Sequence, residues 1–140
     1  MPDAFAPGPS RPSAVPLFTG AAILDAEKLR VYQLAVEFQT LAAGLVPRQR
    51  GVLLATLRDQ LDRASVSIVL NVAEGAGRFS PPDKARFYGI ARGSATECGA
   101  LVDLLFARRL VTAPTHQTAR ALVVRIVQML TRLTASMAAR

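Results

Sequence analysis

The sequence predicts an all-α protein, an antiparallel up-down-up-down bundle of four helices. Apolar residues make up 51% of the 140-residue chain and aromatic residues only 6%, which favours a helical core of alanine, leucine and valine. Apolar positions recur three and four residues apart over long stretches, and no alternation at period two is long enough to demand a sheet. Short connections separate these stretches, so consecutive helices should be antiparallel neighbours.

The proline distribution divides the chain into a flexible tail at 1–20 and the bundle at 21–140. The tail holds five of the nine prolines, a density that blocks both helix and sheet. Val15, Leu17 and Phe18 also allow a short strap that docks on the same bundle or on a neighbouring protomer. The sequence leaves both alternatives open.

The first helix is predicted at 25–43. Asp25 would be its N-cap and Glu27 would lie favourably near its positive end. Gly44 and Pro47 would stop it.

The second helix is predicted at 49–74. Gly75 and Gly77 should end it, because glycine adopts positive φ angles readily. Its inward line alternates three and four residues apart and comprises Leu57, Leu61, Ala64, Ile68, Asn71 and Gly75.

The third helix is predicted at 81–109, with Ser80 as N-cap, Pro81 in the first turn and Asp83 three residues after the cap. Glycine inside a helix costs about 1 kcal/mol relative to alanine, so its glycines predict close approach of another helix. Its apolar seam comprises Phe87, Ile90, Ala91, Ser94, Cys98, Leu101 and Leu105.

The fourth helix is predicted at 113–137, after Thr112 and before a seam of apolar residues. Val123, Val127 and Leu130 widen the apolar arc, and Val124 lies nearly opposite the seam. A single bundle core needs a narrower stripe, so we expect a second apolar contact, between protomers. The seam comprises Ala119, Leu122, Ile126, Met129, Leu133 and Met137.

Polar side chains follow the second and third helices in lines that should face each other. A buried amide or carboxylate costs about 1–3 kcal/mol unless it is hydrogen-bonded, so these residues need partners. An Arg–Glu network within the bundle is the main interpretation; contact with a ligand or between protomers is the alternative. The predicted structural polar network comprises Arg63, Ser67, Asn71, Glu74, Arg78, Arg92, Ser94 and Glu97.

The same stretch carries a family resemblance. RASVSIVLNVAEGAGR at 63–78, followed by IARGSATECGALVDLL at 90–105, is similar to the four-helix-bundle family of ribosomal-RNA intervening-sequence proteins. That family includes the accessory variability determinant of diversity-generating retroelements. The similarity runs from about residue 29 to 133, whereas residues 1–20 have no counterpart and the 47–60 segment is a few residues longer than usual. The matching residues are Gln60, Arg63-Ala64, Ser67-Ile68, Asn71 to Gly75, Gly77-Arg78, Phe87, Ile90-Ala91, Gly93-Ser94 and Glu97.

The resemblance implies a homo-oligomer, a ring of five bundles that binds nucleic acid and works with a reverse transcriptase. By the same resemblance, the polar residues of the motif organise the bundle rather than touch the nucleic acid.

The charge distribution gives a physical reason for nucleic-acid binding. The net charge is +7 with a pI of about 11, and after Asp103 the chain has six arginines and no acidic residue. Such a block can hold phosphates, although a solvated basic face is an equal alternative. With few aromatic residues to stack on bases, we expect little sequence readout. The predicted nucleic-acid-binding residues are Arg48, Arg50, Arg58, Arg108, Arg109, Arg120, Arg125 and Arg132.

The chain offers little for catalysis, a metal or a cofactor, and we expect none of them. His116 is the only histidine and should be exposed at a helix start, which argues against a di-iron bundle and a serine triad. Cys98 is the only cysteine, lies on a predicted seam and fits a reducing cytoplasm. We also expect no signal peptide and no membrane span.

Two functions therefore remain. The first is a non-enzymatic, oligomeric, basic bundle that binds RNA or DNA as accessory to a reverse transcriptase or another nucleic-acid enzyme. The alternative is an oligomeric scaffold whose charge recognises an acidic protein partner without nucleic acid.

Overall fold

The computed structural model describes residues 24–46 and 51–139, and within them it is all-helical. A 3₁₀ turn, η1 (Asp25–Lys28), precedes α1 (Arg30–Ala42). Three long helices follow: α2 (Val52–Gly77), α3 (Pro81–Ala107) and α4 (Ala113–Ala138). The all-α prediction with four helices is confirmed.

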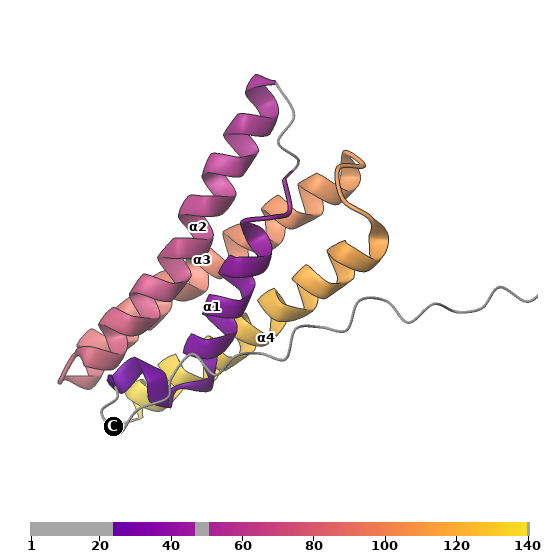
Figure 1. The fold of residues 1–140 in the computed structure, drawn as a ribbon. Coiled ribbons are helices and arrows are strands. Elements are labelled where there is room, and N and C mark those ends of the chain that lie inside the picture. The colour runs from indigo at the N-terminus through magenta and orange to yellow at the C-terminus, as the bar shows by residue number, and fades with distance from the viewer. Residues whose placement is uncertain (1–23, 47–50, 140) are drawn as a thin grey trace, which may run out of the picture.

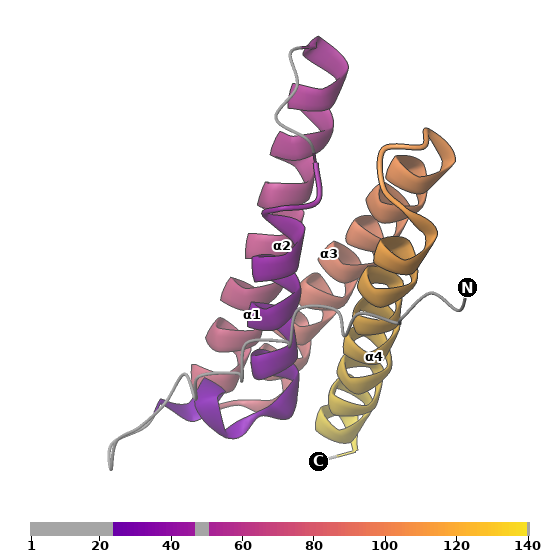
Figure 2. The same cartoon turned by 45° about the vertical axis from the view of Figure 1, so that its right-hand side comes forward.

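The helices pack as a bundle in which each contacts its two neighbours. α2 lies against α3, α3 against α4, and the shorter α1 against both α2 and α4 (Figure 1). Turned by 45°, α1 stands beside α2, and the C-terminal end of α4 lies at the same end of the bundle as the start of α1 (Figure 2). The turn between α3 and α4 therefore lies at the opposite end from the turn between α2 and α3.

Two helix starts follow from local sequence. The Ser80 hydroxyl accepts a hydrogen bond from the Asp83 backbone N–H at 3.2 Å, and the Thr112 hydroxyl accepts one from Thr115 at 3.4 Å. Both bonds satisfy a donor that a helix N-terminus leaves free. The predicted start at Asp25 is wrong, because Asp25 lies in η1 and Leu29, which offers no side-chain cap, precedes α1.

The predicted end of α2 is also wrong. The helix continues through Gly75 to Gly77, and neither glycine has a positive φ. A side chain from α3 explains the extension: Lys84 Nζ donates to the carbonyl oxygens of Gly75 and Ala76 at 3.2 and 2.8 Å. A cation at a helix C-terminus satisfies free carbonyls and complements the helix dipole.

Gly75 has a packing role instead. A Cβ added there would lie 2.7 Å from Cε1 of Tyr88, whose residue is only 2% exposed. Tyr88 also has a raised pKa, first because burial disfavours the phenolate and second because Asp25 is near. The glycine thus lets the Tyr88 ring lie directly against the backbone of α2.

The buried faces of α3 and α4 differ slightly from the predicted seams. On α3, Tyr88 and Ala95 are buried while Ile90 is 44% exposed, so Ile90 does not belong to the seam. On α4, Leu122, Met129 and Leu133 flank the core. The buried residues of α4 are Ala119, Val123, Ile126, Leu130 and Met137.

The glycines of α3 do not all serve helix contacts, contrary to the prediction. A Cβ at Gly89 or Gly93 would meet nothing within 4 Å, and both residues are exposed. Only Gly99 lies against another helix, with 3.4 Å from a built Cβ to Val123 Cγ1.

One helix of the described residues, α4, is long and apolar enough to cross a membrane by length and composition, with 22% of its most apolar window buried. Ala119, Ile126 and Leu130 of this helix are fully buried, and the helix packs against α3 and α1. We therefore interpret α4 as a bundle helix. The expectation that nothing spans a membrane stays a prediction.

Candidate nucleic-acid interface

The turn from α3 to α4 holds two of the eight predicted arginines. Arg108 and Arg109 follow the last residue of α3, and both are exposed. Within the described ranges, neither forms an ion pair with a carboxylate. Both cations also lie at the carbonyl end of α3, where the helix dipole favours positive charge.

The backbone fixes where these two arginines lie. The Leu110 N–H donates to the Leu105 carbonyl at 2.8 Å and the Arg109 N–H to the Phe106 carbonyl at 2.9 Å. These are the two bonds of a Schellman cap, and its left-handed position is held by Arg109 with φ 59°. Glycine usually occupies that position, because a side chain there costs roughly 1 kcal/mol.

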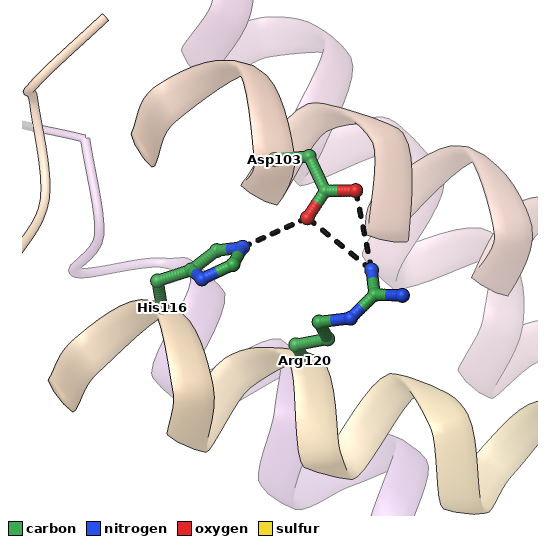
Figure 3. A network of polar contacts seen from close by, with 3 residues as sticks. All are labelled: Asp103, His116 and Arg120. Carbon is green, nitrogen blue, oxygen red and sulfur yellow. Dashed lines mark hydrogen bonds and ion pairs between the residues drawn. The ribbon is translucent and has the colours of Figure 1, made fainter. Parts of the chain in front are cut away.

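Beside the turn, three polar side chains tie α3 to α4 (Figure 3). Asp103 of α3 points between His116 and Arg120 of α4. His116 Nε2 lies 2.8 Å from Asp103 Oδ1, and Arg120 Nη1 donates to Oδ1 and Oδ2 at 3.3 and 3.2 Å. The Asp103 carboxylate thus contacts both His116 and Arg120, so Arg120 is already paired.

His116 is not the freely exposed histidine that the sequence suggested. Its side chain is 16% exposed, and its ring stacks on Phe106 with centroids 4.4 Å apart and planes 11° from parallel. Sequence reasoning missed both contacts, because they depend on how α3 packs against α4. No local pattern in the sequence indicates either of these two contacts.

The remaining predicted arginines do not share one face. Arg125 and Arg132 are exposed and seven residues apart, so they lie on one side of α4. Arg132 lines a shallow groove with Arg30 and Leu29 at the far end of the bundle. Arg58 on α2 is half-buried and interacts with neighbouring residues. Arg48 and Arg50 lie outside the described residues.

The predicted polar network is only partly assembled. Across α2 and α3, the hydroxyls of Ser67 and Ser94 are 2.8 Å apart. Asn71 Nδ2 donates to the Ser67 carbonyl at 2.8 Å and to its hydroxyl at 3.1 Å. These three residues are half-buried and satisfy one another, as the cost of burying free polar groups requires.

Among the described residues, the charged members of that network form no ion pair between α2 and α3. Glu74 of α2 pairs with Arg78, the residue that follows α2, and Arg78 also lies 4.7 Å from the centre of the Phe87 ring. Arg92 Nε donates to Thr131 Oγ1 of α4 at 2.8 Å. Arg63 and Glu97 are exposed and, within residues 24–46 and 51–139, join no ion pair. These residues therefore do not form the predicted Arg–Glu network between the helices that the structure describes.

Cys98 is fully buried in the core, with its pKa raised to about 12. Burial is the main cause, and the negative charge of Glu97 adds to it. A thiol so poor at ionising is a weak nucleophile and metal ligand. Among the described residues, no three His, Cys, Asp or Glu side chains come together in a way that could hold a metal ion.

Two comparisons with known proteins find a match, one by a family model and one by fold. The model of the family described as 23S rRNA-intervening sequence protein matches residues 27–132. A crystal structure of a protein of unknown function from the S23 ribosomal protein family of Bacteroides thetaiotaomicron VPI-5482 has a similar fold, with a TM-score of 0.67. The two chains are 20% identical, and the similarity covers 74% of this chain and 97% of the other. No curated protein matches.

Proposed function

Because this chain belongs to the 23S rRNA-intervening sequence protein family, we propose that it is a non-enzymatic, oligomeric bundle that binds nucleic acid through its arginines. The observation that carries the proposal is the α3–α4 turn, where Arg108 and Arg109 are exposed and form no ion pair with any described residue, while Asp103 is occupied by His116 and Arg120. From Leu104 to Arg140 the chain has six arginines and no acidic residue.

The chemistry of such a surface favours phosphates over base edges. Arginine forms charge-assisted, bidentate hydrogen bonds with phosphate oxygens, and each contact releases condensed counterions. Affinity should therefore fall steeply as salt rises, with little dependence on sequence. The protein would act in the cytoplasm as accessory to a reverse transcriptase or another nucleic-acid enzyme.

Oligomerisation would multiply this charge. The large apolar residues left exposed lie mainly on α2 and α3. The sequence predicts the second apolar contact, between protomers, on α4 instead. Leu70 is 61% exposed and Val66 40%, with Ile90 of α3 also open to solvent. These side chains suit a contact between copies, and we propose a ring of five on the family resemblance. A strictly monomeric mass at micromolar concentration would overturn it.

A charge-reversal experiment tests binding. We expect Arg108→Glu/Arg109→Glu to weaken binding of labelled RNA and DNA and to reduce the slope of log K against log salt by about 1.5, at 0.7–0.9 per lost phosphate contact. The control is Arg63→Glu/Arg86→Glu, two exposed arginines elsewhere, which changes the net charge equally. Equal losses in both variants, or no binding by the parent protein at low salt, would refute the proposed site.

The second candidate is a scaffold that recognises an acidic protein. The exposed apolar residues beside charged ones favour it, since protein interfaces combine an apolar centre with a polar rim. Deleting residues 1–20 separates the two functions. A scaffold that uses this segment loses its partner, whereas a charge-driven nucleic-acid binder barely changes.

A further inference from the structure

The α3–α4 turn carries an aromatic surface as well as charge. Phe106 is 41% exposed although one face of its ring stacks on His116. In the part of the chain that the structure describes, no second ring and no cation lies over Phe106. One side of a flat ring is thus supported by the protein, while the residue remains accessible to a ligand.

The support under that ring is held in place. The His116 ring is fixed by its 2.8 Å contact with Asp103, and Asp103 is in turn held by Arg120 (Figure 3). A ring that is already oriented loses little conformational freedom when a second ring stacks on it. The stack is therefore prepared for a planar ligand.

Two positive charges follow the ring closely in the sequence. Arg108 and Arg109 follow Phe106 by two and three residues, and the left-handed backbone at Arg109 turns the chain out of the helix there. A stacking aromatic next to unpaired arginines is the arrangement by which proteins hold single strands, with bases on rings and phosphates on cations. We infer that the α3–α4 turn binds single-stranded nucleic acid, with an unpaired base stacked on Phe106 and its neighbouring phosphates held by Arg108 and Arg109.

This inference rests on the proposed function and narrows it to one substrate class. Bases within a duplex already stack on one another, so a ring on the protein surface reaches only an unpaired base. Phe106 thus modifies the expectation of purely charge-driven binding: one base would contribute stacking, still without reading its identity, because every base has an aromatic face.

The test compares single strands with duplexes of equal phosphate number. We expect Phe106→Leu to weaken binding of a single-stranded RNA about tenfold, since stacking on one ring contributes this order of affinity. Duplex binding and the salt slope should stay unchanged, because the arginines remain. Phe106→Tyr should restore single-strand binding. Phe79→Leu is the matched control, since Phe79 is a fully exposed phenylalanine in the turn between α2 and α3.

A second measurement observes the stacking directly. A single strand that carries one 2-aminopurine should change its fluorescence on binding the parent protein and the Tyr variant, and should not do so with Phe106→Leu. If Phe106→Leu binds single strands as tightly as the parent while Arg108→Glu/Arg109→Glu does not, the stacking inference is wrong and the proposed function stands. If the parent binds neither RNA nor DNA, both are wrong.

Discussion

The contact between Gly75 and Tyr88 predicts that an alanine at position 75 destabilises the protein, whereas an alanine at the uncrowded Gly93 stabilises it. A Cβ at Gly75 would lie 2.7 and 2.9 Å from two atoms of the Tyr88 ring and 3.2 Å from Phe87 Cβ. The ring is buried and cannot move aside without disturbing the core, and overpacking of this kind costs about 1–3 kcal/mol. Alanine recovers at most about 1 kcal/mol of helix propensity, and less here because Gly75 is close to the helix end.

We therefore expect Gly75→Ala to lower the free energy of unfolding by about 1–2 kcal/mol. Gly93→Ala, in the middle of α3 with nothing within 4 Å of a built Cβ, should raise it by about 1 kcal/mol. Urea denaturation followed by circular dichroism measures both. Because the proposed contacts between copies would make the midpoint depend on concentration, the series should be run at several protein concentrations. If Gly75→Ala stabilises as much as Gly93→Ala, the close approach of Tyr88 is not tight.

Three further predictions follow from single side chains. Lys84→Met should cost about 1.5–3 kcal/mol of unfolding free energy, because the two α2 carbonyls lose a charged donor; an unchanged urea midpoint would contradict the cap. Arg109→Gly should stabilise the fold by roughly 1 kcal/mol while weakening nucleic-acid binding, and a destabilised variant would show that the left-handed position carries no strain. Cys98, whose folded pKa of about 12 exceeds its ordinary value of 9.0, holds its proton in the folded state. The thiol of Cys98 thus makes its full contribution to the free energy of unfolding below pH 9. Above pH 9 the thiol ionises in the unfolded state only, so this contribution falls by about 1.4 kcal/mol per pH unit. Cys98→Ala should flatten that part of the stability profile, and an identical profile would exclude the thiol as its source.

The fold could be predicted where local chemistry decides it. Ser80 and Thr112 mark helix starts because a hydroxyl before a proline-containing first turn caps the backbone, and both caps form. The end of α2 could not be predicted, because the residue that satisfies its carbonyls, Lys84, lies on the next helix. The sequence pattern predicts a stop at Gly75, because it does not reveal that an aromatic ring will occupy the space of the missing side chain.

The candidate site was predictable only in its charges. The acid-free segment after Asp103 indicated a basic region, and Arg108 and Arg109 are exposed within it. The stacking of Phe106 on His116 could not be foreseen, because it depends on the rotation of α3 and α4 about their axes. The same packing brings Arg120 of α4 to Asp103 of α3.

The order in which the helices contact one another has a consequence for synthesis. The most extensive contacts join α2 with α3 and α3 with α4, neighbours in sequence connected by short turns, and such local contacts form quickly. α1 is made first, yet it lies against both α2 and α4, and α4 is made last. On the ribosome, the apolar face of α1 around Leu34 and Phe38, both fully buried in the finished bundle, must therefore wait for the C-terminal helix before it is completely covered.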